Sequence, residues 1–359
     1  MSARSKAKPG LLDWIDHRIA LREWVRRRIL SARVPARGRA WQSIGFLLLL
    51  LFGLQLASGV LLLFHFSPHP DHAFASVTRI MREVPFGWLI RLAHVSAANL
   101  MVLLVFLHLF RSAFVGAYKE PRELTWITGC ILFLLTLGLA LSGYILPWSQ
   151  LSYWATTVVS SSLEYLPLVG HALLRVLRGG DLVGPATFSR AFASHVVLLP
   201  LLLLIVLVVH LALIWRTGLA GPAQRKGSPP NPSATEPAFP GFALRVVATG
   251  VGLVMLIVAL AVFWPDLFLP EESFQPANPL ETPPAVKPAW YLLWAYQLPR
   301  MMPEALALLL QGIAVAGLFA LPFLDRSPHR HPLDRPLVTL GIGLALLVLI
   351  LLTVLGYRA

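Results

Sequence analysis

The 359-residue chain is 57% hydrophobic and 13% charged, with a mean hydropathy of +0.70. This composition is typical of a protein with several membrane spans and excludes a soluble domain. The single cysteine, Cys130, excludes an internal disulfide bond and a zinc or iron–sulfur site that needs two cysteines. A net charge of +13 is compatible with nucleic-acid binding, but its distribution along the chain favours a membrane surface instead.

The amino-terminal segment carries most of this charge. Residues 1–41 hold eleven Lys and Arg against three Asp and Glu, a net charge of +8 beside the first apolar run. Such a segment predicts a cytoplasmic amino terminus that contacts anionic lipid, with no role for nucleic acid. Residues 11–32 within it are amphipathic, which predicts a helix lying on the membrane surface. No cleavable signal peptide is expected, because the first long apolar run starts only near residue 42.

Seven apolar runs are each long enough to cross about 30 Å of hydrocarbon. They are expected at 42–64, 90–112, 126–147, 191–215, 244–264, 304–324 and 337–356. A cytoplasmic amino terminus then places the carboxyl terminus outside, and the Lys and Arg residues of the loops agree with this orientation. The stretch 219–242 contains Gly, Ser and several Pro, which predicts a linker between a four-helix domain, 42–218, and a three-helix domain, 243–359.

Two of the spans carry paired histidines. His94 and His108 are fourteen residues apart, which places both imidazoles on one face of a helix, about 21 Å apart along it. His195 and His210 repeat the pattern at a spacing of fifteen residues. An ionisable side chain inside an apolar span is costly and indicates a function. Four histidines at two depths on two helices therefore favour two stacked bis-histidine sites over satisfied core residues.

Two other spans repeat the same spacing with glycines, namely Gly45 with Gly59 and Gly129 with Gly143. Glycine in a membrane helix allows a bulky group or another helix to approach the backbone closely. Helix packing explains either pair alone. The alternation of glycine and histidine pairs over four successive spans favours a bundle that holds two flat macrocycles, with glycines beside their faces and histidines as axial ligands.

The direction of the spans assigns a depth to each histidine. Spans two and four run from outside to inside, so His94 pairs with His195 at the outer level and His108 with His210 at the inner level. Each pair fills both axial positions of one haem iron, which suits electron transfer rather than oxygen binding.

Two arginines are placed to bind the carboxylates of the outer haem. Arg91 lies one turn before His94, and Arg190 lies five residues before His195. Contact with lipid headgroups explains both arginines equally well. The predicted fold is thus an all-α membrane protein with an amphipathic surface helix, a four-helix haem-binding bundle and three further transmembrane helices.

Residues spread in order along the chain carry a family resemblance. They are Gly45, Gln55 and Gly59; Gly87, Trp88, Arg91 and His94; the run 143–148; Thr187, Arg190, His195 and Pro200; and, in the second domain, 277–280, Thr282, Pro283 and 288–291. In these positions the chain resembles cytochrome b of the quinol:cytochrome c or plastocyanin oxidoreductases, from about residue 11 to the end. The spacing of His195 and His210, the run 216–218 and the three-helix tail resemble the chloroplast-type branch, in which the tail is a separate subunit.

The resemblance implies a subunit of a bacterial inner-membrane complex that works by a Q cycle with two non-covalent b haems. Quinol is oxidised in an outer pocket between 143–154 and 276–300, with one electron going to a Rieske iron–sulfur protein. The other electron crosses both haems to a quinone near the cytoplasmic face. A c-type cytochrome as partner and a homodimeric complex are further expectations from the family.

The resemblance also implies roles for single residues. The quinol-site residues are Tyr291, Trp290, Pro288, Glu281 and Tyr153. The haem-site residues, beside the four histidines, are Arg91, Arg190, Gly45, Gly59, Gly129, Gly143, Gln55 and Arg216. The aromatic stretch 148–190 is suited to roof an apolar quinol pocket, although structural packing explains it equally well.

Two departures from the family pattern matter. The family has a glutamate, thought to accept a quinol proton, where this chain has Ala289, and a methyl group cannot act as a base. Either another group accepts the proton, or the outer site is slow or altered; the candidates are Glu281, Glu271, Glu272 and Tyr153. The chloroplast-type branch also attaches a haem through a cysteine where this chain has Ser43, so no covalent haem is expected.

Two other classes of function compete with this interpretation. A two-haem membrane anchor of a dehydrogenase or hydrogenase explains the histidines and Ala289, but not the matching residues between Asn278 and Tyr291. A transporter with histidines as proton relays predicts no haem, and the glycine spacing speaks against it. Two b-type α-bands in the purified protein would exclude the transporter.

Overall fold

The computed structural model describes residues 16–18, 20, 23, 33–35, 39–221, 223, 225–227, 235–284 and 286–358, with side chains from residue 43 onward in the first long helix. Most of the amphipathic helix expected over 11–32, and much of the linker expected over 219–242, lie outside these residues. The domain boundaries therefore stay predictions.

Seven helices among the described residues are long and apolar enough to cross a membrane. They are α3 (Arg39–Leu63), α5 (Gly87–Phe114), α6 (Glu123–Tyr144), α9 (Pro185–Ala193) continued through a π-helical turn (Ser194–Leu198) into α10 (Leu199–Thr217), α11 (Ala243–Phe263), α13 (Glu304–Leu324) and α14 (Pro336–Arg358). Each coincides with an apolar run of the sequence, so the predicted all-α membrane fold is confirmed.

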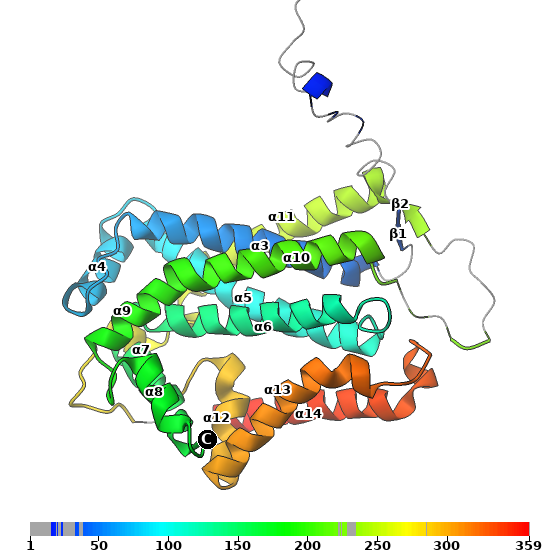
Figure 1. Cartoon of the computed structure of the whole chain (residues 1–359). Coiled ribbons are helices and arrows are strands. Elements are labelled where there is room, and N and C mark those ends of the chain that lie inside the picture. Colours follow the sequence, from blue (N-terminus) through cyan, green and yellow to red (C-terminus); the bar gives the residue numbers. More distant parts are fainter. Residues whose placement is uncertain are drawn as a thin grey trace, which may run out of the picture.

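Helices α3, α5, α6 and α10 run side by side and form the four-helix bundle (Figure 1). Helix α3 packs on α5 and α6 packs on α10, while α11 covers α3 and α5. The buried core of the bundle consists of Leu51, Phe52, Ala97, Met101, Leu203 and Ile257. On α3, α5 and α10 these residues lie between the two glycine or histidine positions, so an apolar layer separates the two levels.

The shorter elements collect at the two ends of the bundle. Helices α4 (Pro70–Arg82), α7 (Gln150–Ser161) and α8 (Gly170–Arg178) lie at one end, named here the α7 end (Figure 1). At the opposite end, named the β1 end, strand β1 (Arg33–Pro35) pairs antiparallel with β2 (Thr235–Pro237). The remaining short elements are η2 (Ser162–Tyr165), η4 (Ala238–Phe242), η5 (Pro265–Leu267), η6 (Glu271–Phe274), η7 (Trp290–Leu292), α12 (Leu293–Met301) and η8 (Pro332–Asp334).

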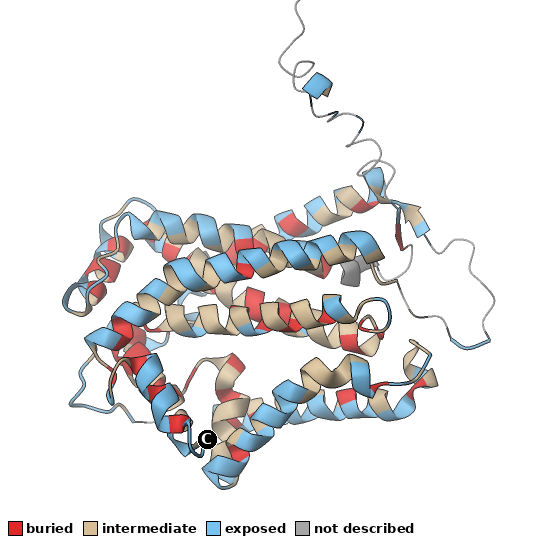
Figure 2. Ribbon diagram, viewed as in Figure 1, coloured by how far each residue is buried: buried red, intermediate tan, exposed pale blue. Residues whose placement is uncertain are grey.

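The outward faces of the spans are exposed and apolar (Figure 2). Large exposed side chains on these faces include Ile205 and Val208 of α10, Val251 and Met255 of α11, and Leu344 of α14. An apolar surface of this extent favours a hydrocarbon environment over water, as expected for helices that cross a bilayer.

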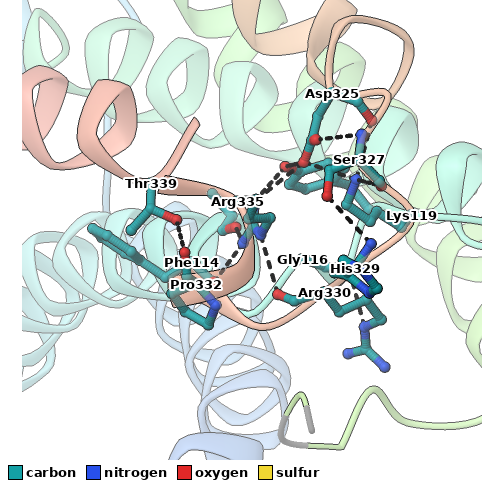
Figure 3. A network of polar contacts seen from close by, with 12 residues as sticks. Phe114, Gly116, Lys119, Asp325, Ser327, His329, Arg330, Pro332, Arg335 and Thr339 are labelled. Carbon is teal, nitrogen blue, oxygen red and sulfur yellow. Dashed lines mark hydrogen bonds and ion pairs between the residues drawn. The ribbon is translucent and has the colours of Figure 1, made fainter. Parts of the chain in front are cut away.

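A buried polar network joins the two domains at the β1 end (Figure 3). Oδ2 of Asp325, just after α13, accepts the hydroxyl of Tyr118 at 2.5 Å and lies 2.8 Å from Nζ of Lys119. Nη1 of Arg335 lies 3.3 Å from the same oxygen and donates to the Tyr118 hydroxyl at 2.5 Å. The network thus connects the loop after α5 to the loop between α13 and α14.

The network determines the charge state of its members. Burial acts to raise the pKa of Asp325, but hydrogen bonds from Lys119 and Tyr118 and the charge of Lys119 outweigh it, so this pKa lies below its ordinary value. Burial and the hydrogen bond to Asp325 raise the pKa of the Tyr118 hydroxyl. Asp325 is therefore a carboxylate at neutral pH, paired with two cations.

Candidate functional site

His94 on α5 and His195 in the π-helical turn face each other. Their ring centres are 6.3 Å apart and the ring planes are inclined by 73°. An imidazole nitrogen binds a metal at about 2 Å, so two rings on opposite sides of one metal have centres roughly 6 Å apart. Among the described residues no group of three or more His, Cys, Asp or Glu is placed to hold a metal ion. This pair of imidazoles would suit a metal whose other ligands come from a bound group, as the ring of a haem supplies them.

The hydrogen bonds of this pair determine which ring nitrogen carries the proton. Nδ1 of His195 lies 3.0 Å from the carbonyl oxygen of Leu139, which only accepts, so Nδ1 is protonated. Nδ1 of His94 lies 2.8 Å from Oγ of Ser58, whose own hydroxyl donates to the Leu54 carbonyl at 2.6 Å. Ser58 is therefore the acceptor, and His94 also carries its proton on Nδ1. Both rings keep the Nε2 lone pair, which is the form that binds a metal.

At the inner level, only one of the two imidazoles has a hydrogen-bond acceptor for its Nδ1. Nδ1 of His210 lies 2.9 Å from Oγ1 of Thr128, whose hydroxyl lies 3.0 Å from the Leu124 carbonyl. Thr128 therefore accepts the Nδ1 proton of His210. Nδ1 of His108, in contrast, is buried and has no hydrogen-bond partner among the described residues.

His108 and His210 line one cavity that reaches from the bundle to the β1 end. Its polar lining comprises these two histidines with Arg111, Ser112, Arg122, Thr125 and Thr217. Nη2 of Arg111 donates to the Ala220 carbonyl at 3.4 Å and Nη2 of Arg122 to the Thr217 carbonyl at 2.9 Å, while the buried Nε of each arginine has no hydrogen-bond partner among the described residues. Two such arginines beside two histidines suit a ligand that carries both a metal and carboxylates.

The four glycines lie beside the imidazoles. The nearest protein atom to an added Cβ is Cε1 of His108 for Gly45 (3.8 Å), of His94 for Gly59 (3.4 Å), of His210 for Gly129 (3.4 Å) and of His195 for Gly143. At Gly143 the added Cβ would overlap the His195 ring. Each glycine thus leaves room for a histidine ring, and the role of the glycines beside a haem stays a prediction.

The π-helical turn explains why one spacing is fourteen and the other fifteen. A π-helical turn holds one more residue than the α-helical turn it replaces. The turn Ser194–Leu198 lies directly after α9 and contains His195. It absorbs the additional residue, so His195 and His210 align with His94 and His108.

The arginines and the glutamine proposed from the sequence lie in different surroundings in the structure. Arg91 is buried one turn from His94. Arg190 donates through Nη1 to backbone carbonyls at the carboxyl end of α8, and Arg216 is exposed on the last turn of α10, outside the lining of the inner cavity. Nε2 of Gln55 donates to the His94 carbonyl at 2.8 Å. Their roles toward a haem stay predictions.

The two segments expected to border the outer quinol pocket meet where the turn after α6 contacts residues 275–281. The backbone N–H of Gln150 donates to the carbonyl of Gln275 at 2.9 Å. Its side-chain oxygen accepts the backbone N–H of Asn278 at 2.6 Å, and its side-chain nitrogen donates to the carbonyl of Glu281 at 2.6 Å. One buried glutamine thus holds the two segments together.

Three of the predicted quinol-site residues are packed inside this region. Pro288 and Tyr291 are buried. Nε1 of Trp290 donates to Oδ1 of Asn99 on α5 at 2.8 Å, which ties the segment to the haem-binding helix.

Two of the proposed proton acceptors are already engaged or exposed. The Tyr153 hydroxyl donates to the carbonyl of Val183 at 3.2 Å, and burial raises the pKa of Tyr153. The Glu281 carboxylate is exposed and accepts Nδ2 of Asn278 at 3.3 Å.

Glu272 is better placed than Glu271, which is exposed. Glu272 is half-buried on η6, which packs against α7, and its charge acts on Tyr144 at the end of α6. Burial and the neighbouring Tyr144 raise the pKa of Tyr291. Glu272 is therefore the least exposed of the three glutamates proposed as proton acceptors.

Reasoning from the sequence missed the hydroxyl acceptors, although a signal was present. A serine or threonine directly precedes three of the four glycines, as Ser58, Thr128 and Ser142. Ser142 Oγ lies 3.4 Å from Nδ1 of His195. The fourth glycine, Gly45, is preceded by Ile44. The cavity arginines Arg111 and Arg122 were also missed; Arg111 lies one turn after His108, as Arg91 lies one turn before His94.

Known proteins resemble the chain over nearly its whole length. Residues 29–218 match the family described as cytochrome b/b6/petB, and residues 276–359 match cytochrome b(C-terminal)/b6/petD. Cytochrome b of Rickettsia conorii is 34% identical over 98% of this chain and 87% of its own length. Cytochrome b/c1 of Bradyrhizobium diazoefficiens is also 34% identical, and this chain spans 52% of it. A solved chain of a hyperthermophilic respiratory Complex III superposes with a TM-score of 0.89 at 35% identity, over 97% of this chain and 91% of that one.

Proposed function

The chain belongs to the cytochrome b family, and we propose that it oxidises quinol in a bc-type complex and carries electrons across the membrane between two b haems. The observation that carries the proposal is the 6.3 Å spacing of His94 and His195, with both rings protonated on Nδ1. His108 and His210 in the inner cavity supply the second pair.

The residues fit the haems that the family implies. A haem held by two imidazoles supplies one-electron transfer without an open position for oxygen. Ser58, Thr128 and the Leu139 carbonyl keep three imidazoles in the tautomer that binds iron. Arg111 and Arg122 offer guanidinium groups to haem carboxylates, and the apolar core between the two levels excludes water.

Quinol is oxidised at the α7 end, in the pocket that Gln150 holds together. Two electrons and two protons leave each quinol. One electron goes to a Rieske iron–sulfur partner and a c-type cytochrome beyond it, and the other crosses the bundle to a quinone at the β1 end. The α7 end faces outside and the β1 end faces the cytoplasm of a bacterial inner membrane. The complex is expected to be homodimeric, as in the family.

The test is quinol-driven reduction of the b haems in membranes, with and without an inhibitor of the outer site. Fast, inhibitor-sensitive reduction would support quinol oxidation at the α7 end without the usual glutamate. Reduction that is slow, insensitive and reaches the haems only from the β1 end would instead indicate a two-haem electron carrier whose outer site is inactive.

A further inference from the structure

The hydroxyl–glycine pairs and the histidine hydrogen bonds follow one repeat. Position 44 lies fourteen residues before Ser58, and Thr128 lies fourteen residues before Ser142. Each of these four positions precedes a glycine that faces one histidine. Three of the four carry a hydroxyl, and the fourth is Ile44.

The absence of a hydroxyl at Ile44 leaves a histidine nitrogen without a hydrogen-bond partner. Gly45 faces His108, and Nδ1 of His108 is the one histidine nitrogen among the four that is buried without a partner. The corresponding contact at the outer level joins Ser58 to His94 at 2.8 Å. An isoleucine side chain has no atom that accepts a hydrogen bond, so Ile44 leaves the Nδ1 proton of His108 unbound.

The two levels therefore differ in the strength of their ligands. A hydrogen bond from Nδ1–H to an acceptor raises the basicity of an imidazole, and a more basic ligand favours oxidised iron. Both outer imidazoles have such an acceptor, Ser58 for His94 and Leu139 for His195. Only one of the two inner imidazoles, His210, has one.

Nearby cations do not distinguish the two levels, because Arg111 and Arg122 line the inner cavity and the buried Arg91 lies one turn from His94 at the outer level. The difference between the levels therefore rests on the hydrogen bonds of the histidines.

We propose that Ile44, by denying His108 the acceptor that Ser58 gives His94, makes the inner site the stronger oxidant and so directs electrons from the outer to the inner level. This inference rests on the proposed binding of two b haems. Ile44 and Ser58 act through the histidines and are positioning residues.

The test is a redox titration of both haems in I44S and S58A, in the whole complex. The serine of I44S supplies an acceptor to His108, so the midpoint potential of the inner haem should fall while that of the outer haem stays. S58A removes the acceptor of His94, so the outer potential should rise. The difference between the midpoint potentials of the two haems should narrow in each variant and be smallest in the double variant.

The matched control is T136A. Thr136 is a buried hydroxyl on the same helix as Thr128, bonded only to the Leu132 carbonyl, so its loss should leave both potentials unchanged. Potentials of I44S and S58A that equal those of T136A would overturn the proposal. If S58A loses its haem, the redox titration of I44S alone tests the proposal, because this substitution adds a hydrogen bond rather than removing one. Absence of two b-type α-bands in the wild type would instead refute the proposed function.

Discussion

At the scale of single residues, Ala289 occupies the position where the family resemblance implies a glutamate that accepts a quinol proton. Ala289 follows the buried Pro288, and its methyl group accepts no proton. Of the three glutamates proposed as proton acceptors, Glu272 is the one that is half-buried, on η6, which packs against α7. Glu281 is exposed to solvent.

We therefore expect E272Q to slow inhibitor-sensitive haem reduction by roughly 100-fold, within the range for loss of a general base. The amide keeps the size of the side chain but cannot take up a proton at neutral pH. The measurement is stopped-flow reduction by quinol. E281Q is the control and should stay near the wild-type rate; equal rates in both variants would remove Glu272 from the route.

The residues proposed for the haem sites could be named from the sequence, but their contacts could not. The four histidines and four glycines follow from spacing within single helices. The acceptors Ser58 and Thr128 directly precede Gly59 and Gly129, but they bind histidines on other helices, 36 and 82 residues away, so this local pattern does not tell which histidine each hydroxyl contacts. The role proposed for Arg216 shows the same limit, because which side of the last helical turn faces the cavity depends on packing.

At the scale of elements, the π-helical turn sets the geometry of α10. In a regular helix fifteen residues correspond to about 60° of net rotation, against about −40° for fourteen. The turn Ser194–Leu198 removes this difference in rotation. Pro200 favours the π-helical turn, because proline has no N–H to complete an α-helical hydrogen bond.

We expect one alanine inserted after Val206 to abolish the inner haem. The insertion turns His210 by about 100° relative to His195, so it no longer faces His108. Deletion of Val196 within the turn should be tolerated, because a regular helix with a spacing of fourteen restores the alignment. The haem content per polypeptide checks both variants. It should be about one haem in the insertion variant and about two haems in the deletion variant. Two haems in the insertion variant would contradict this account.

At the scale of the whole molecule, the number and length of the spans were predictable because apolar runs identify them. The contacts between the two domains were not, because they join segments more than 100 residues apart. Arg330 illustrates this: it donates to the carbonyl of Gly116 at 3.2 Å and to that of Gly221 at 3.0 Å. It thereby bridges two chain segments at the mouth of the inner cavity.

We expect R330Q to lower the midpoint potential of the inner haem and to leave the outer one unchanged. Burial and the charges of Arg122, Arg111 and Arg335 lower the pKa of Arg330. Loss of one positive charge beside the cavity makes reduction less favourable. Redox titration measures the shift, with R326Q as control because Arg326 is exposed in the same loop. A shift of equal size in both variants would mean that only the charge of the loop matters.

The Asp325 network should make the docking of the domains depend on pH. Because the folded-state pKa of Asp325 lies below its unfolded value of about 3.9, its contribution is fully present above that value and is lost as pH falls through the folded-state pKa. D325N should remove the contribution at every pH. It leaves Lys119 and Arg335 buried without their carboxylate, and breaking a buried pair costs about 3–5 kcal/mol.

Thermal unfolding of the purified protein between pH 7 and pH 3 checks this expectation. The wild type should lose stability near the acid end of the range, and D325N should begin lower and show a flatter profile. D334N is the matched control, since Asp334 lies in the same loop and accepts only the backbone N–H of Lys226 among its described contacts. A D325N profile that runs parallel to the wild type would show that another carboxylate governs the acid transition.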